Sequence, residues 1–153
     1  MSIIFEARNR KAGFNYNLED GYTAGIELKG DEVKSIKLKK FDITDGYVTI
    51  TKNLEAMIHQ MNIQVYDKSS AFAASYEATR SRRLLLKKKE IYKLFTLTQK
   101  TNKTIIPSRL IYTSSHLVKI EIKIASPLKK YDKRQKLKDK DIKRQAKAEK
   151  QDY

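Results

Sequence analysis

The sequence predicts a mostly β fold with some α structure: a small barrel or sandwich of short strands, two helices and a basic tail. Between Tyr22 and Ser126, short apolar runs alternate with polar residues, as in strands that bury one face. Two stretches have helical spacing instead, and the composition becomes cationic after Pro127. The chain has 153 residues with 40% apolar content, enough for one modest core. We therefore expect one folded body, residues 1–127, and a C-terminal tail, residues 128–153.

Alternation is clearest at residues 117–125, where Val118, Ile120 and Ile122 alternate with charged residues. Four further runs rich in Ile, Val, Thr and Tyr show a similar pattern, namely 23–28, 46–51, 56–65 and 108–113. Turn residues lie between the runs, and Ser114-Ser115 is expected to close a tight hairpin. Several short strands at this spacing are typical of a small barrel or sandwich.

Two segments are expected to be helices beside the strands. Residues 30–40 open with two candidate caps, Gly30 and Asp31, and place a narrow apolar stripe at helical spacing. Residues 87–99 carry apolar side chains on one face, and the leucines at 84–86 before them fit a buried strand or turn. These helices could plug the ends or one side of a barrel.

The charge balance indicates a polyanionic partner. The chain has 33 Lys and Arg against 18 Asp and Glu, a net charge of +15, which exceeds what solubility needs. Nucleic acid is the leading partner and an acidic membrane surface is the rival. No stretch approaches the roughly 18 apolar residues of a spanning helix, and no basic helix has a clean aromatic face. The start of the chain does not resemble a secretory signal, so we expect a cytoplasmic protein without membrane contact.

Catalysis is not expected from this sequence. The chain has no cysteine, which excludes thiolate zinc sites and cysteine nucleophiles. His59 and His116 stand alone on expected strands, where a structural role is the common one. Asp31 and Glu32 could hold magnesium in a metal-dependent nuclease, but adjacent carboxylates at a helix start are more often caps. Because no glycine-rich phosphate loop is present, we expect no cofactor.

Two basic stretches favour RNA binding. Residues 9–16 interleave cations with Phe14 and Tyr16, which pairs phosphate contacts with rings that can stack on unpaired bases. The alternative is a basic arm whose aromatic residues enter the core. Residues 79–89 place six cations around three leucines; a charged edge strand explains some of them, but six within eleven positions exceed that need.

The tail is expected to be mostly disordered alone. Residues 129–153 hold eleven Lys or Arg and five Asp or Glu, and they cannot bury enough apolar surface to fold by themselves. They lack Gly and Pro and are rich in helix formers. We expect a helix once phosphates neutralise the lysines. A solvating tail without a role is the alternative.

Four blocks of the sequence, in order and over nearly its full length, resemble the SsrA-binding protein (SmpB) family. They are NRKA (9–12) followed by Tyr16, AGIELKGDEVKSI (24–36), TRSRRLLLKKKEI (79–91) and KKYDKR (129–134). One such block is weak evidence, but four in register are specific. The resemblance implies a six-stranded antiparallel barrel related to the OB fold, with flanking helices and an unstructured basic tail.

The resemblance also implies a non-enzymatic function. A protein of this family binds the tRNA-like domain of transfer-messenger RNA and, with EF-Tu on the same RNA, brings it to ribosomes stalled without a stop codon. The body replaces the missing anticodon arm. The tail enters the decoding centre and the empty messenger channel, where it folds as a helix. A monomer is sufficient for this role, and the runner-up is a ribosomal or general single-strand-binding OB protein.

Position by position, the resemblance assigns residues to each RNA. Those expected to contact transfer-messenger RNA are Asn9, Arg10, Lys11, Tyr16, Lys34 and Arg80, and the basic block adds Arg82 and Lys87. Those expected to serve the decoding centre are Tyr131, Asp132, Lys133 and Arg134, with Lys136, Lys138 and Ile142 further along the tail.

Three positions depart from the family pattern. Thr23 replaces the usual Glu before Ala-Gly, and it lacks the carboxylate that would bond to an RNA base edge. Glu77-Ala78 replaces Asp-Pro ahead of the basic block. Pro127-Leu128 replaces the Gly-Lys that opens the tail. Because proline fixes its own φ and favours an extended Ser126, we expect a stiffer exit with one fewer cation.

Overall fold

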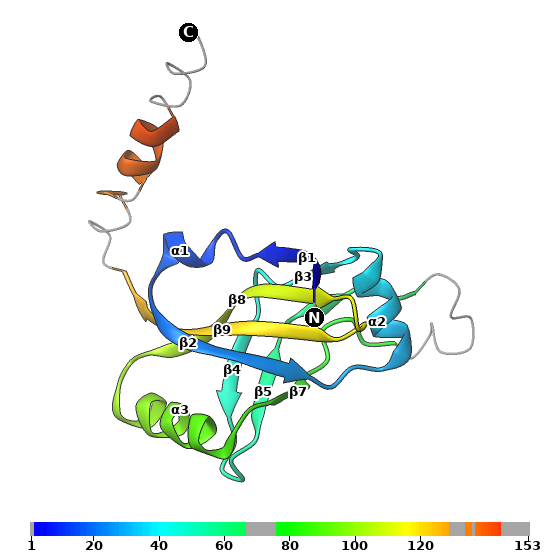
Figure 1. The fold of residues 1–153 in the computed structure, drawn as a ribbon. Coiled ribbons are helices and arrows are strands. Elements are labelled where there is room, and N and C mark those ends of the chain that lie inside the picture. The colour runs from blue at the N-terminus through cyan, green and yellow to red at the C-terminus, as the bar shows by residue number, and fades with distance from the viewer. Residues whose placement is uncertain (1, 67–75, 129–133, 136, 145–153) are drawn as a thin grey trace, which may run out of the picture.

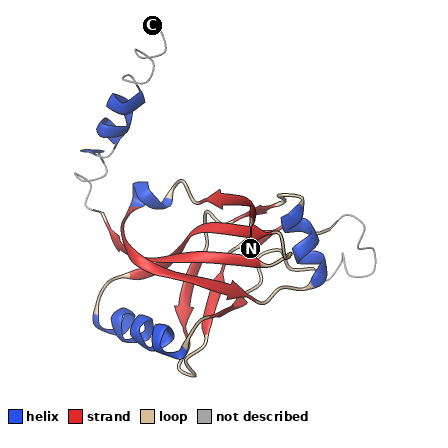
Figure 2. Ribbon diagram, viewed as in Figure 1, coloured by secondary structure: helices blue, strands red, loops and turns tan. Residues whose placement is uncertain are grey.

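The computed structural model describes residues 2–66, 76–128, 134–135 and 137–144, and its body is built on a β barrel (Figures 1 and 2). The strands are β1 (Ile3–Arg8), β2 (Tyr16–Ile26), β3 (Phe41–Asp42), β4 (Tyr47–Ile50), β5 (Ala56–His59), β6 (Asn62–Ile63), β7 (Arg82–Leu85), β8 (Thr104–Thr113) and β9 (Val118–Pro127). The helices of the body are α1 (Ala12–Asn15), α2 (Gly30–Lys37) and α3 (Lys88–Lys100).

Six antiparallel strands close into a ring. The sheet order is β1-β8-β4-β5-β7-β2-β9, and a further pairing of β8 with β9 joins the ends of the six strands from β8 to β9. Strand β1 lies outside the ring, where it pairs with the C-terminal half of β8, and β4 pairs with the same strand at Ile105. The predicted six-stranded antiparallel barrel is therefore confirmed.

The core fills the ring with aliphatic side chains. Val118, Ile120 and Ile122 of β9 are buried, as their alternation predicts. Ile36 of α2 and Leu94 of α3 belong to the same buried cluster, so each helix packs one apolar residue row against the barrel. Figure 1 shows α2 and α3 at different ends of the body, with α1 beside the exit of the chain from β9.

Several local features differ from the sequence-based expectations. Strand β1 and helix α1 were not anticipated, and the run 56–65 is two strands because Gln60 has a φ of 58°. The cap of α2 is Lys29, whose N–H donates to Glu32 Oε1 at 2.9 Å, rather than Gly30 or Asp31. His116 lies in the β8–β9 turn with a φ of 61° and not on a strand.

A bulge in β2 requires glycine at position 21. The pairing of β2 with β9 shifts register between Glu19 and Gly21, and a Cβ on Gly21 would lie 1.7 Å from the carbonyl oxygen of Ile122. Gly21→Ala is therefore expected to lower the free energy of unfolding by about 2 kcal/mol or more, because two backbones must separate. Urea denaturation measures this effect.

Gly13→Ala is the matched control, because no heavy atom lies within 4 Å of a Cβ at that position. It is expected to change the free energy of unfolding by less than about 0.5 kcal/mol. Equal stability of the two variants would show that the β2 bulge does not need a residue without Cβ.

Candidate nucleic-acid interface

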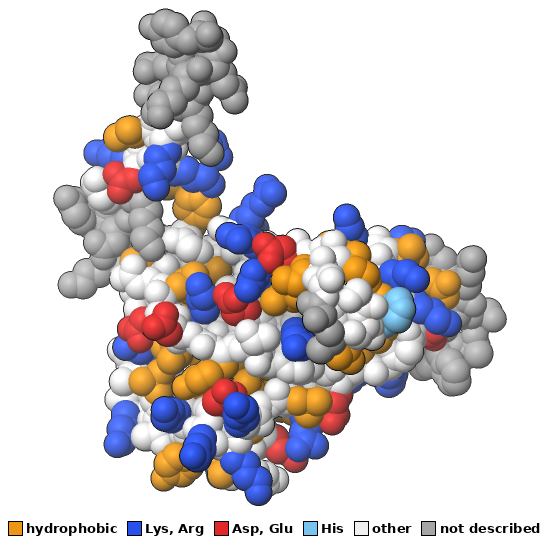
Figure 3. Space-filling view, in the orientation of Figure 1, with side chains coloured by type: hydrophobic (Ala, Val, Ile, Leu, Met, Phe, Trp, Pro, Cys, Tyr) orange, Lys and Arg blue, Asp and Glu red, His pale blue; other side chains and the backbone are white. Residues whose placement is uncertain are grey.

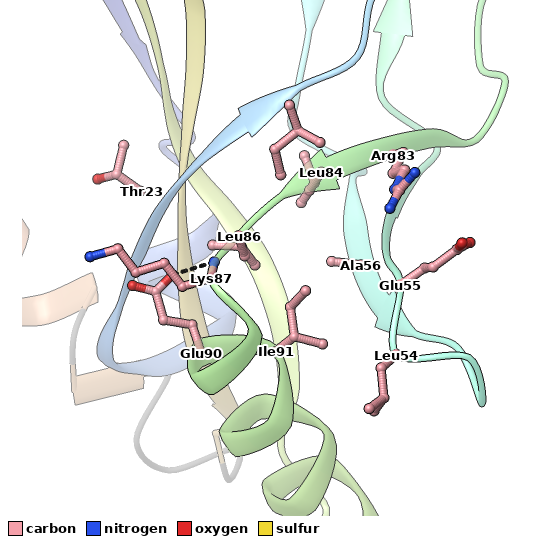
Figure 4. A pocket seen from close by; sticks show the side chains of 11 residues that line it. Thr23, Leu54, Glu55, Ala56, Arg83, Leu84, Leu86, Lys87, Glu90 and Ile91 are labelled. Atoms are coloured by element: carbon pink, nitrogen blue, oxygen red, sulfur yellow. Dashed lines mark hydrogen bonds between the residues drawn. The ribbon is translucent and has the colours of Figure 1, made fainter.

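A groove of about 600 Å³ lies between the tip of the β4–β5 hairpin, strand β7 and the start of α3 (Figure 4). Its apolar part includes Leu54 and Leu85, which are 42% and 50% exposed. Figure 4 shows Lys87 and Glu90 on the side of Thr23, with Arg83 near Glu55 on the other side. The groove therefore combines an apolar wall with cations, a combination that suits ribose and phosphate together.

The cations of this groove make only weak contacts with carboxylates. Arg83 Nη1 lies 3.9 Å from Glu27 Oε1, and both side chains are at least half exposed, so this ion pair contributes little. The backbone N–H of Lys87 donates to Glu90 Oε2 at 3.3 Å, which stabilises the start of α3. Lys87 itself is exposed. Figure 3 shows Lys and Arg side chains over α3 and over the tail helix on the same face of the molecule.

A second group of predicted residues surrounds α1. Arg10 and Lys11 are exposed and Tyr16 is half-buried, which leaves the two cations accessible to phosphate. Asn9 is buried instead, and its backbone N–H donates to Ser108 O at 2.8 Å. Its Nδ2 donates to Pro107 O at 3.0 Å. Asn9 therefore joins β1 to β8, which is a structural contribution that the sequence reading did not include.

The side chain of Arg82, which was predicted to contact RNA, is fully buried in the structure. Its Nε donates to Glu32 Oε2 at 2.6 Å, and its other nitrogens donate to the carbonyl oxygens of Met61 at 2.6 Å and Ala78 at 3.0 Å. Arg80 also donates to Glu32 and keeps 26% of its side chain exposed. Both arginines therefore take part in an ion cluster around the buried carboxylate of Glu32.

Glu32 is the centre of this cluster. Burial alone would raise the pKa of its carboxyl, but hydrogen bonds from Arg80, from the Lys29 N–H and from Arg82 outweigh burial and hold that pKa below its usual value. Its two oxygens are therefore occupied by donors. This leaves Glu32 unable to serve as the magnesium ligand of the nuclease hypothesis.

Within the part of the chain that the structure describes, no three His, Asp or Glu side chains gather as a metal site. No helix among the described residues is long and apolar enough to span a membrane. Lys34 lies on α2 with 59% of its side chain exposed, and its Nζ is 5.3 Å from the centroid of the Tyr66 ring. The predicted RNA residues thus form three separate groups, beside α1, α2 and α3.

The sequence of this chain matches a known protein family. The family model described as SmpB protein matches residues 6–152. The chain belongs to the SmpB family. SsrA-binding proteins of Oenococcus oeni and Staphylococcus carnosus are 42% and 44% identical over 91% and 90% of this chain, covering 87% and 86% of their own lengths. The SsrA-binding protein of Geotalea uraniireducens is 40% identical over 94% of this chain and 93% of its own.

A solved structure shares the fold as well. A chain from the structure described as "tmRNA-SmpB: a journey to the center of the bacterial ribosome" is 30% identical, with a TM-score of 0.67. The match covers 82% of this chain and 85% of that chain. The barrel described above is therefore the fold of the SmpB family.

The KKYDKR block (129–134) begins directly after Leu128, the last residue that is buried among those the structure describes. Pro127 pairs with Tyr16 at the end of β9, and Leu128 is only 8% exposed, with its N–H 3.5 Å from Asn15 O. Leu128, which was assigned to the tail, therefore packs against the body. Arg134, Lys138 and Ile142 lie in exposed helical segments, whereas the decoding-centre predictions for Tyr131, Asp132, Lys133 and Lys136 fall outside the described residues.

Sequence reasoning missed two parts of the surface. Leu85 was counted as part of a buried run, although strand alternation between Leu84 and Leu86 would have placed it outside. The stacked rings of Tyr47 and His59, with centroids 5.0 Å apart, pair across β4 and β5. No local pattern identifies them, because their contact depends on the strand register.

Replacement of Glu32 is expected to destabilise the fold strongly. Glu32→Ala leaves the buried Arg82 charge without its partner, which should cost about 3–5 kcal/mol in the free energy of unfolding. Glu27→Gln is the control: its carboxylate belongs to an exposed pair, so a change below about 1 kcal/mol is expected. Urea denaturation at neutral pH measures both, and equal losses would contradict the assigned role of Glu32.

The same cluster predicts a dependence of stability on pH. Because the folded pKa of Glu32 lies below its ordinary value of 4.5, ionised Glu32 stabilises the fold fully above that value. This stabilisation is lost as pH falls through the folded pKa. The difference in unfolding free energy between the wild type and Glu32→Gln should therefore shrink from pH 7 towards pH 3, and a constant difference would refute this linkage.

Proposed function

We propose that this protein binds the tRNA-like domain of transfer-messenger RNA and delivers it to stalled ribosomes for trans-translation. The observation that carries the proposal is the family match over residues 6–152, because it includes the body and the tail. The relatives at 40–44% identity are named SsrA-binding proteins, and SsrA is the transfer-messenger RNA that such proteins bind. The protein would act by binding and shape, without chemistry of its own.

The body is proposed to hold the RNA through the groove beside α3 and the cations beside α1. Arg83 and Lys87 are accessible beside the half-exposed Leu85, so phosphates and a sugar or base face can be contacted together. Arg10 and Lys11 supply further phosphate contacts. Thr23 lines the groove where the family usually has a carboxylate, so affinity here rests more on phosphate and apolar contacts than on a base-edge acceptor.

The tail is proposed to be a separate unit that acts on the ribosome. Residues 129–153 carry a surplus of cations. The side chains of the described helical part are exposed, and its contact with the body is the cation–π contact of Lys140 Nζ, 4.1 Å from the centroid of the Phe14 ring. We infer that the tail orders fully when phosphates of the decoding centre and messenger channel neutralise it. The remaining parts of the proposal are a monomer, EF-Tu bound to the same RNA, and action in the cytoplasm.

Lys87→Ala is expected to weaken binding of the tRNA-like domain and to reduce the slope of log affinity against log salt by about 1, because one phosphate contact is lost. Gel shifts across a salt series measure the slope. Lys100→Ala, at the far end of α3, is the control and should leave the slope unchanged. Equal slopes for the two variants would exclude Lys87 from the interface.

Removal of residues 129–153 should separate RNA binding from delivery. The truncated protein keeps the buried Leu128 and is expected to bind the tRNA-like domain within about tenfold of the full chain, while peptide tagging on stalled ribosomes is lost. A variant with residues 129–153 scrambled retains the charge and should also fail in tagging. If truncation abolishes preference for the tRNA-like domain over unrelated tRNA, the division between body and tail is wrong.

A further inference from the structure

A second cleft, of about 370 Å³, opens between α1, the segment before β4 and strand β8. Its walls include two tyrosines, Tyr16 from the start of β2 and Tyr47 from the start of β4. The polar side chains of Asn15, Thr44 and Asp45 line it as well. This volume lies within the roughly 300–1,000 Å³ of small-ligand sites, and the groove beside α3 does not share its residues.

Tyr47 is held in place by an aromatic neighbour. Its ring stacks on His59 with centroids 5.0 Å apart and an interplanar angle of 29°. Both nitrogens of His59 are engaged, because Nε2 lies 2.7 Å from Thr49 Oγ1 and Nδ1 lies 2.7 Å from Ser81 Oγ. Hydroxyl groups on two sides thus fix the imidazole, and the imidazole supports the tyrosine ring, which remains 42% exposed.

One residue of the cleft wall carries a buried acceptor without a partner. Asn9 lines it and is 9% exposed, with its Nδ2 donating to Pro107 O. Its Oδ1 is buried and has no hydrogen-bond partner among the described residues. Because an unpaired buried acceptor is costly, a ligand with an amino or imino donor, reaching it through a small shift of the side chain, would satisfy it.

We propose that this cleft binds one unpaired RNA base, stacked on Tyr47 and hydrogen bonded by the polar wall. An exposed, rigid tyrosine is suited to stacking on any base, and the asparagine and aspartate side chains can read a base edge. The exposed Arg10 and Lys11 precede α1 and can contact the flanking phosphates. His59 acts as a positioning residue for Tyr47.

This inference rests on the proposed function for its choice of RNA as the ligand. The base could come from transfer-messenger RNA or from ribosomal RNA, because the stacking chemistry is the same. The position where the chain leaves the body helps to separate these sources. The N–H of Leu128 donates to Asn15 O, and Asn15 lines the cleft. The cleft therefore lies beside the start of the segment assigned to the ribosome.

The test uses a single-stranded RNA nonamer with 2-aminopurine at its centre, whose fluorescence falls when the base stacks. Wild type and Tyr47→Phe should quench it, because both keep the ring. Tyr47→Ala should lose the quenching and bind about 5- to 100-fold more weakly, the effect of removing one stacked base contact. Tyr92→Ala is the matched control, since Tyr92 is a 63% exposed tyrosine on α3, and it should behave as wild type.

His59 is tested by a conservative variant. His59→Ala should reduce the quenching, and His59→Phe should restore most of it, because a ring again supports Tyr47. A purely structural role of His59 predicts equal quenching by all variants that fold, as checked by circular dichroism.

The source of the base is separated by repeating the affinity measurements with the tRNA-like domain and with purified small ribosomal subunits. If Tyr47→Ala lowers the affinity for only one of these two partners, the RNA of that partner supplies the base. Indistinguishable behaviour of Tyr47→Ala and Tyr92→Ala with every probe would overturn the inference. A different result would contradict the proposed function: wild-type protein that binds the tRNA-like domain no more tightly than unrelated tRNA.

Discussion

The buried contact between Glu32 and Arg82 is the constraint on which the rest of the body depends. Placing two charges in the interior costs several kcal/mol per ion unless every donor and acceptor is satisfied. Here the guanidinium reaches Glu32 and the carbonyl oxygens of Met61 and Ala78. One side chain of β7 thereby joins α2, the turn after β5 and the segment before β7. Because both charges are fully buried, neither can leave this arrangement without losing its partner.

The position of the groove follows from this contact through strand geometry. With Arg82 and Leu84 facing inward, Arg83 and Leu85 must face outward, since side chains alternate along a strand. The pairing of Met57 with Arg83 and of Ala56 with Leu84 fixes this register across β5. A slip by one residue would bury Arg83 and Leu85 and expose the present core. The ion cluster at one end of β7 therefore determines which residues the groove presents at the other.

Local periodicity predicted most of the barrel strands and the two longer helices, and tertiary contacts explain part of what it missed. The alternation of β9 and the apolar faces of the two longer helices depend only on neighbours in sequence. The burial of Arg82 depends on a carboxylate 50 positions away, so a cationic stretch such as 79–89 cannot be divided into structural and exposed residues by composition. The bulge at Gly21 and the break at Gln60 likewise arise from backbone contacts that propensities do not contain.

The 33 Lys and Arg residues of the chain therefore overstate the number of cations that can meet RNA. Besides the two arginines on Glu32, Arg109 is bound by Glu6 and Glu121, and Lys103 by Glu19. Cations already compensated in the free protein neutralise no phosphate and release no counterions on binding. The salt dependence of the complex should report the exposed cations beside α1 and α3 and those of the tail. Charge sets the attraction between protein and RNA, and the fold selects which part of that charge is available.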